Sequence, residues 1–300
     1  MPSRISSNSR TEVRNPASRG LDRLSAEKIL RLMNREDEKV ARGVAREIPA
    51  IARAVEAIVR AIRRGGRLIY VGAGTSGRLA VLDASECPPT FGVSPNLVQA
   101  LIAGGKRALT SAVEGAEDSY AAGARDLRRR NLTARDVVVG IAASGKTPYA
   151  LGALAYARKR RAVTVAIACN RNSPLARAAR IKIVPEVGPE VVTGSTRLKA
   201  GTAQKLVLNM LSTAAMVHLG HVYDNWMIDV AQTNAKLRHR AVVILSQAAR
   251  ADVSAATRAL RQSGRNLRVA LIMLKRGAPA REARNLLKRA GGNLRRALGE

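Results

Sequence analysis

Five short apolar runs alternate with helical patterns between residues 67 and 184, and this alternation restricts the possible fold more than any other feature of the chain. The five runs, each a candidate for a buried strand, cover residues 67–71, 97–102, 136–142, 162–168 and 181–184. Apolar strands separated by helices are typical of a parallel sheet with helices on both faces. The sequence therefore predicts an α/β fold with three layers, αβα, and a mainly parallel sheet.

Helical patterns precede and follow the predicted sheet. After a polar, Arg- and Ser-rich arm over residues 1–24, a helix begins at Ser25, and a second covers residues 48–64. A long helix is predicted over residues 200–219. Beyond Leu237 only helices are expected, near residues 240–249, 254–262, 266–275, 279–289 and 291–298. We therefore divide the chain into an arm and helix (1–50), a domain that contains the predicted sheet (51–221) and a small all-α subdomain (236–300).

Composition excludes several classes of protein. With 46% hydrophobic residues the chain can form a real core, so a disordered protein is excluded. No apolar run reaches the roughly 18 residues that a membrane helix needs. The first residues carry no apolar signal-peptide core, and two cysteines, Cys87 and Cys169, cannot form a disulfide framework. These features predict a cytoplasmic protein.

The formal net charge of +30 raises nucleic acid as a possible partner. The basic residues lie within or at the ends of helical patterns, among Ala and Leu, and do not form a low-complexity tail. One Phe, one Trp and five Tyr leave little for base stacking, and no nucleic-acid motif is present. We interpret the excess as solvated basic faces, and expect neither a specific nucleic acid nor a membrane as a partner.

In an open α/β sheet, ligands bind at the carboxyl ends of the strands. Three such ends lead into stretches rich in Gly, Ser and Thr, at residues 72–78, 143–149 and 188–199. Such loops expose backbone N–H groups and hydroxyls, and the dipole of a following helix favours an anion. Gly72-Ala-Gly-Thr-Ser-Gly77 also matches the dinucleotide motif G-x-G-x-x-G. A dinucleotide site would also need a second strand that ends in an acid. Residues 82–90 look instead like a loop with a double proline. A phosphate monoester is therefore a better match to these loops than a dinucleotide.

A resemblance to a known family rests on longer strings. The loops at 72–78 and 143–149 resemble the phosphosugar-binding sugar-isomerase (SIS) domain, which has a flavodoxin-like fold. Almost the whole chain is similar to bacterial N-acetylmuramic acid 6-phosphate etherases. The strings that carry this similarity include Leu-Asp-Ala-Ser-Glu-Cys-Pro-Pro-Thr (82–90), Val-Glu-Gly-Ala-Glu-Asp (113–118) and Val-Val-Thr-Gly-Ser-Thr-Arg-Leu-Lys (191–199). The resemblance implies a homodimer with a UBA-like C-terminal subdomain, a role in peptidoglycan recycling, and no metal or organic cofactor.

The reaction that the resemblance implies is cleavage of the D-lactyl ether of N-acetylmuramic acid 6-phosphate by water, giving N-acetylglucosamine 6-phosphate and D-lactate. In the open-chain sugar the ether lies β to the aldehyde, which acidifies the C2 proton. Elimination expels lactate, and water then adds to the unsaturated aldehyde. Carboxyl groups whose pKa is raised by burial can transfer these protons near neutral pH. By motif position Glu86 matches the family's acid that protonates lactate, and Glu117 matches the second catalytic carboxylate.

The remaining candidate residues bind substrate. Ser76, Ser144 and Thr147 are the predicted phosphate hydroxyls, with Thr75, Gly145 and Lys146 adjacent. Glu190 is expected to orient the sugar. The predicted contacts to the acetamido group or the lactyl carboxylate come from Ser195, Thr196 and Lys199.

Other readings stay open at this point. The same loops would serve a sugar-phosphate isomerase or a non-catalytic phosphosugar sensor, although Glu86 in its Pro-rich segment argues against the isomerase. His218 and His221 have no acid or cysteine at metal-ligand spacing, so we interpret them as structural or surface residues. Cys87 is expected to be a packing thiol, and Trp226 a core or interface anchor.

Overall fold

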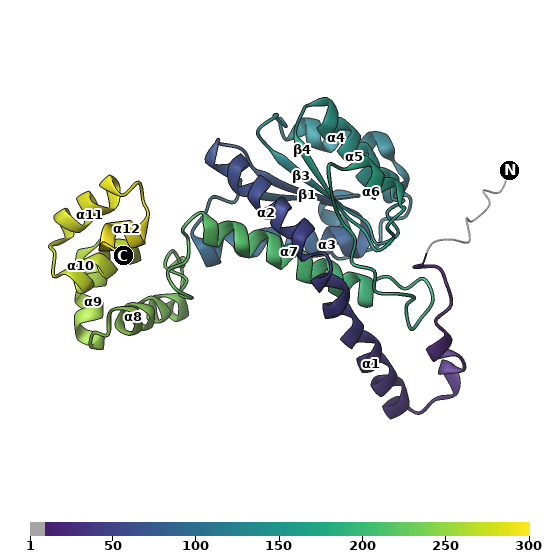
Figure 1. Cartoon of the computed structure of the whole chain (residues 1–300), viewed down its shortest axis with the longest axis horizontal. Coiled ribbons are helices and arrows are strands. Elements are labelled where there is room, and N and C mark those ends of the chain that lie inside the picture. The colour runs from purple at the N-terminus through teal and green to yellow at the C-terminus, as the bar shows by residue number, and fades with distance from the viewer. Residues whose placement is uncertain (1–9) are drawn as a thin grey trace. The chain divides into compact units, whose positions relative to one another are not determined.

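One parallel sheet with strand order β2-β1-β3-β4-β5 organises the computed structural model, which describes residues 10–300 (Figure 1). The strands are β1 (Leu68–Gly72), β2 (Val98–Ile102), β3 (Val137–Ile141), β4 (Val163–Ile167) and β5 (Ile181–Ile183). Gly72 pairs with Ile102 on one side and with Ile141 on the other, so the carboxyl ends of neighbouring strands are level. All five predicted strands and the α/β fold are confirmed.

Helices cover both faces of the sheet. Figure 1 shows α4 (Tyr120–Arg129), α5 (Pro148–Lys159) and α6 (Pro174–Ala178) on one face. Buried side chains such as Ile69, Val71, Val138 and Leu154 fill the core between that layer and the strands. The other face carries α2 (Ile48–Arg63), α3 (Gly74–Phe91) and α7 (Lys199–His218). The three predicted layers are therefore present.

Helix α3 corrects the prediction of a loop at residues 82–90, because the helix runs through both Pro88 and Pro89 to Phe91. A proline inside a helix removes one backbone hydrogen bond and disfavours the helical turn before it. Here tertiary contacts outweigh that cost. The buried carboxylate of Asp83 accepts hydrogen bonds from Tyr70 on β1 and from Asn209 and Ser212 on α7.

The predicted arm is packed onto the protein over its described part, and its first nine residues lie outside the described residues. Two short 3-10 turns, Pro16–Ser18 and Leu21–Arg23, precede α1 (Ala26–Ala45). Thr11 and Asn15 are buried, at 2% and 5% exposure. Polar side chains so deeply buried need partners, and those partners lie beside the candidate site.

The chain divides into two compact units. The larger runs to Ser85 and resumes over Asn96–Thr213, and the smaller comprises Glu86–Pro95 and Ala214–Glu300. The smaller unit contains the predicted C-terminal helices as α8 (Ala235–Ala249), α9 (Val253–Gln262), α10 (Leu267–Arg276), α11 (Ala280–Arg289) and α12 (Leu294–Leu298). Side chains such as Leu245, Leu260 and Leu271 form its own core.

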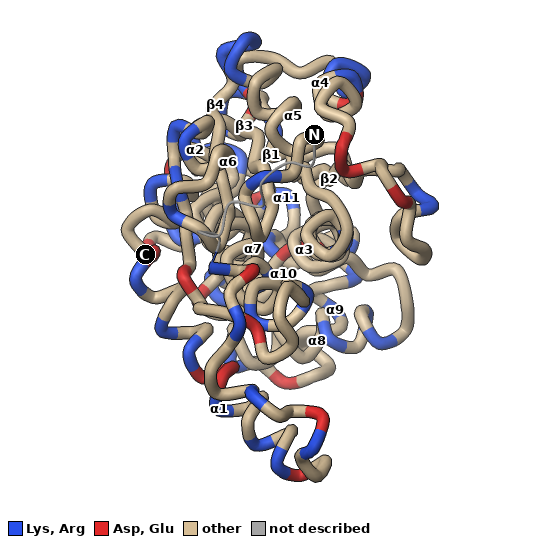
Figure 2. The backbone as a smooth tube through the Cα atoms, turned by 90° about the vertical axis from the view of Figure 1, so that its right-hand side faces the viewer, with Lys and Arg blue, Asp and Glu red and all other residues tan. Residues whose placement is uncertain are grey.

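Lys and Arg outnumber Asp and Glu along the whole chain, 52 to 22, and are spread over many elements of both units (Figure 2). Across residues 10–300, no helix combines the length and the apolar character needed to cross a membrane.

Candidate active site

The turn from β1 into α3 forms the first loop of the site. Ser76 is buried in the first turn of α3, and its Oγ donates a hydrogen bond to Oε1 of Gln204 on α7, 2.9 Å away. Gly77 packs so closely that a Cβ there would lie 2.6 Å from the side chain of Ile102 on β2. This tight packing brings the N-terminus of a long helix, with its unpaired N–H groups, to the edge of the sheet.

The turn from β3 into α5 forms the second loop. Ser144 Oγ accepts a hydrogen bond from the backbone N–H of Lys146 at 3.2 Å, and Thr147 occupies the N-cap of α5. Gly145 has φ of +67°, and a Cβ there would lie 2.3 Å from Ser173. Only glycine fits such a turn, and the turn aims the start of α5 at the same edge of the sheet.

Residues 188–199 form the third segment, at the start of α7. Glu190 is 1% exposed, and its two oxygens accept hydrogen bonds from the backbone N–H groups of Lys199 and Ala200 at 3.0 and 2.9 Å. Its carboxylate therefore caps α7 in this structure. Ser195 and Thr196 lie in the loop just before the helix and are half-buried.

The ammonium of Lys199 is also engaged within the protein. It is 1% exposed, and its Nζ lies 2.5 Å from Oε2 of Glu36 on α1. Glu36 further accepts hydrogen bonds from Asn15 and Lys39. Although burial opposes the charged form, these partners lower the pKa of Glu36 to about 2. This buried cluster joins the arm, α1 and the start of α7 behind the site.

Four hydroxyls around these loops have no hydrogen-bond partner within residues 10–300. They belong to Thr75, Thr147, Ser195 and Thr196, and all four side chains are half-buried. A Cβ built on Gly201 of α7 would lie 3.4 Å from Thr75, so the first and third segments are in contact. Unpaired hydroxyls beside helix N-termini can bind a phosphate oxygen without first breaking bonds inside the protein.

The two candidate catalytic carboxylates lie on different elements. Glu86 is exposed on α3 and belongs to the smaller unit, whereas Glu117 is exposed in a short 3-10 turn, Ala116–Asp118, of the larger unit. Glu114 is likewise exposed, three residues before Glu117. The burial expected around the catalytic pair is therefore not supplied by residues 10–300 of one chain.

The cysteine thiols and His221 are buried or paired within the protein. Burial raises the pKa of the Cys169 thiol to about 12, with a smaller contribution from the charge of Glu190. Cys87 is buried as well. His221 Nδ1 lies 2.7 Å from Asp229 Oδ2, which agrees with a structural role. Among the described residues, no group of three or more His, Cys, Asp or Glu could hold a metal ion.

Two residues that contact these loops, Asn170 and Gln204, were not among the candidates from the sequence. Asn170 follows β4, and its Nδ2 donates to the carbonyls of Ala143 and Ser144, while its Oδ1 accepts from the N–H of Arg10. Its place at the carboxyl end of a predicted strand was a usable signal. Gln204 had no such signal, since it lies inside a predicted helix. Its Nε2 is buried and has no partner among residues 10–300.

Two family models match: the glucokinase regulatory protein N-terminal SIS domain over residues 50–158, and the SIS domain over residues 105–214. The chain is 55% identical over 288 residues to proteins named N-acetylmuramic acid 6-phosphate etherase from Pectobacterium atrosepticum and Serratia proteamaculans. The alignments cover 96% of this chain, and 95% and 97% of those proteins. A solved phosphoheptose isomerase from Francisella tularensis gives a TM-score of 0.48 at 17% identity, covering 66% of this chain and 98% of the isomerase.

Proposed function

Since this chain belongs to the family of N-acetylmuramic acid 6-phosphate etherases, and is thus an enzyme of the carbon–oxygen lyase type, we propose that it converts N-acetylmuramic acid 6-phosphate and water into N-acetylglucosamine 6-phosphate and D-lactate. The observation that supports this most directly is the set of unpaired hydroxyls of Thr75, Thr147, Ser195 and Thr196, which lie beside the N-termini of α3, α5 and α7. That arrangement suits the phosphate of a sugar phosphate.

In the proposal, phosphate binds between the first and second loops. Ser76 and Ser144 contribute hydroxyls, and Thr75, Gly145, Lys146 and Thr147 contribute further hydrogen-bond donors. The N-termini of α3 and α5 place partial positive charge at the phosphate. Ser195 and Thr196, at the start of α7, then bind the acetamido group or the lactyl carboxylate.

Glu190 and Lys199 act as positioning residues for the start of α7. Glu190 holds the first N–H groups of α7, and Lys199 anchors that helix to Glu36. Both side chains are 1% exposed and already paired, so they act through the loop that carries Ser195 and Thr196.

The chemistry is an elimination followed by a hydration, and each step needs one proton transfer at carbon and one at oxygen. In the first, Glu117 removes the C2 proton of the open-chain sugar, the C3–O bond breaks, and Glu86 protonates the leaving lactate oxygen. In the second, water adds its hydroxyl to C3 and a proton returns to C2. Within each step the aldehyde of the substrate takes up the electron pair as an enolate, and between the steps that pair forms the C2=C3 double bond. The exposure of both carboxylates suits groups that the bound sugar itself covers.

Two readouts separate the two roles. D-lactate release measures the complete reaction, and exchange of the C2 proton with deuterated solvent measures proton removal alone. With EDTA present, we expect both activities in the wild type. Glu86→Gln should keep C2 exchange but lose lactate release by at least about 100-fold, and Glu117→Gln should lose both. Glu114→Gln, also exposed and only three residues from Glu117, is the matched control and should behave like the wild type.

A folded wild type that binds the sugar phosphate but releases no lactate would contradict the etherase proposal and favour a phosphosugar sensor. Conversion of a sugar phosphate into its isomer without lactate would favour the isomerase. If Glu114→Gln abolished turnover as Glu117→Gln does, the assignment of the second carboxylate would be wrong.

We also propose that the chain acts as a homodimer. Apolar side chains are exposed in the larger unit, including Leu82 on α3 at 52% and Met210 on α7 at 37%. The helices α3 and α7 contact each other through Asp83 and Asn209, and apolar side chains exposed on neighbouring helices can form one surface that a partner covers. Sedimentation at several protein concentrations should give twice the chain mass of 32.0 kDa, and a monomer at all concentrations would contradict the proposal.

A further inference from the structure

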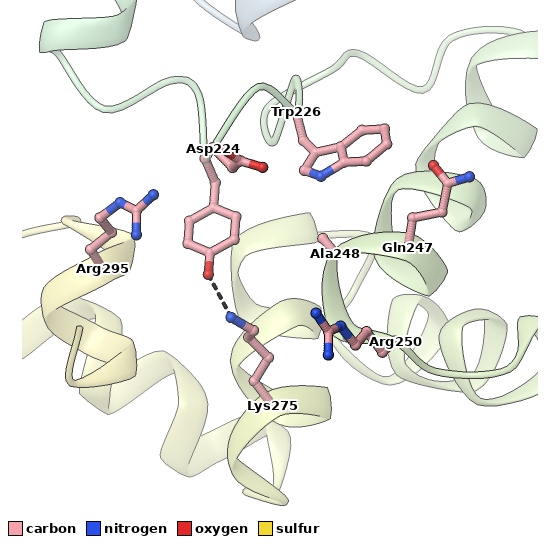
Figure 3. Close-up of a pocket in the computed structure, with 9 residues that line it drawn as sticks. Asp224, Trp226, Gln247, Ala248, Arg250, Lys275 and Arg295 are labelled. Carbon is pink, nitrogen blue, oxygen red and sulfur yellow. Dashed lines mark hydrogen bonds between the residues drawn. The ribbon is translucent and has the colours of Figure 1, made fainter.

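The smaller unit contains a cavity of about 510 Å³ that the proposed reaction does not use (Figure 3). Its walls come from the turn at residues 223–226, the end of α8, the end of α10 and α12. All of its lining residues belong to the smaller unit. A volume of this size suits a small organic ligand.

A tight turn supplies the aromatic wall. Tyr223 and Trp226 exchange two backbone hydrogen bonds, of 3.1 and 2.8 Å, and form an antiparallel bridge. Residues paired in this way direct their side chains to the same side. Asp224, between them, has φ of +53°, which is uncommon for a residue other than glycine. The turn thus presents two rings and one carboxylate to the same cavity, and Figure 3 shows Trp226 above Arg250 and Lys275.

Three cations line the same cavity from separate elements. Lys275 Nζ lies 5.0 Å and Arg295 Cζ 5.1 Å from the centre of the Tyr223 ring, within the range of cation–π attraction. The guanidinium of Arg250, at the C-cap of α8, has no hydrogen bond or ion pair with any residue in 10–300. Against these three positive charges the lining holds one carboxylate, that of Asp224.

The side chain of Glu300 already places an anion on this cluster. Its carboxylate lies 2.7 Å from Lys275 Nζ and 3.2 Å from Arg295, and it accepts the hydroxyl hydrogen of Tyr223 at 2.9 Å. These partners lower the pKa of Glu300 from its usual value. The cluster therefore binds a carboxylate within the protein, while the guanidinium of Arg250 has no anionic partner among residues 10–300.

We propose that this cavity binds a monosaccharide that carries a phosphate or a carboxylate, and that the side chain of Glu300 occupies the anion position until such a ligand displaces it. The acid group would lie among Arg250, Lys275 and Arg295. The ring would pack on Trp226. Gln247 and Asp224 would bind hydroxyls, because a carboxylate and an amide oxygen in the lining accept the hydrogen bonds that sugar hydroxyls donate.

Trp226 is the only tryptophan of the chain, so its fluorescence reports on this cavity directly. The wild type is titrated with glucose 6-phosphate and with glucuronate, which test the phosphate and the carboxylate separately. Inorganic phosphate and glucose are titrated separately, because each carries only one of the two parts of the proposed ligand. We expect a saturable change in emission with at least one of the anionic sugars, and at least about tenfold weaker binding of inorganic phosphate or of glucose.

Two variants test the assignment. Arg250→Gln should weaken binding by about tenfold, whereas Arg261→Gln, an exposed arginine of α9 without a side-chain partner in the described chain, should not. Glu300→Gln should tighten binding several-fold, because the internal competitor loses its charge. That gain would not follow from a purely structural role of Glu300.

Ser76→Ala separates this cavity from the candidate active site and should leave the fluorescence titration unchanged. The proposal is overturned if neither anionic sugar changes the emission, or if Glu300→Gln weakens binding. It is also overturned if Arg250→Gln and Arg261→Gln bind equally well, or if Ser76→Ala abolishes the signal.

Discussion

Replacing Glu36 by glutamine tests whether the buried charge cluster behind the site stabilises the larger unit. Glu36 is 3% exposed and lies among Lys199, Lys39 and Asn15. Its pKa falls from 4.5 to about 2, and a difference of 2.5 pKa units corresponds to about 3 kcal/mol of stability. Glu36→Gln also leaves the ammonium of Lys199 buried without a counter-ion. Breaking a buried pair from one side costs about 3–5 kcal/mol, which is the loss we expect at neutral pH.

The sign of the pH dependence follows from the direction of the shift. A carboxyl group whose pKa is lowered by folding contributes its full stability above its unfolded pKa of 4.5, and that stability is lost as the pH falls from 4.5 towards 2. Urea unfolding followed by circular dichroism, at neutral pH and at several values below 4.5, measures both quantities. The wild type should lose about 3 kcal/mol more than Glu36→Gln across this acid range.

Two further variants complete the design. Glu38→Gln changes an exposed glutamate on the same helix and should stay within about 0.5 kcal/mol of the wild type. The double variant Glu36→Gln with Lys199→Met removes both charges and should be more stable than Glu36→Gln alone. If Glu36→Gln lost no more unfolding free energy than Glu38→Gln, the buried cluster would not stabilise the larger unit. The same conclusion would follow if the stability of these two variants depended on acid pH in the same way.

Three other predictions concern residues in or near the loops of the site. In thermal unfolding, Gly145→Ala should lower stability by about 1–3 kcal/mol more than Gly291→Ala. Both glycines have positive φ, but only at Gly145 would a Cβ lie within 2.3 Å of a neighbouring side chain. Equal losses of stability would disprove this steric explanation. Cys169, with its pKa raised to about 12, should react with a thiol-specific reagent far more slowly at neutral pH in the folded protein than in urea. Equal rates would show that the thiol is accessible. Gln204→Leu should raise KM for the sugar phosphate several-fold with a smaller effect on kcat, since Ser76 loses the partner that orients its hydroxyl, and an unchanged KM would remove Gln204 from the site.

The strands, and the loops that follow them, were predictable from the sequence because both depend on short segments. An apolar run such as residues 136–142 has few alternatives to a buried strand. The carboxyl ends of parallel strands lie at one edge by topology, so Ser76, Ser144 and Thr147 could be assigned to a common site before any contact was known. The same rule applied to residues 162–168 would have included Asn170.

Tertiary structure alone decided what the buried polar groups do. Residues 82–90 look like a loop by local preference, yet Asp83 is held in α3 by partners from β1 and α7. Lys199 looks like a substrate ligand, yet its ammonium is paired with Glu36, 163 residues away in the chain. A buried charge must find a partner, but the sequence does not state which distant element will carry that partner. The pattern of residues therefore determined where this protein builds its site, and the packing of α1, α3 and α7 determined which side chains remain free to use it.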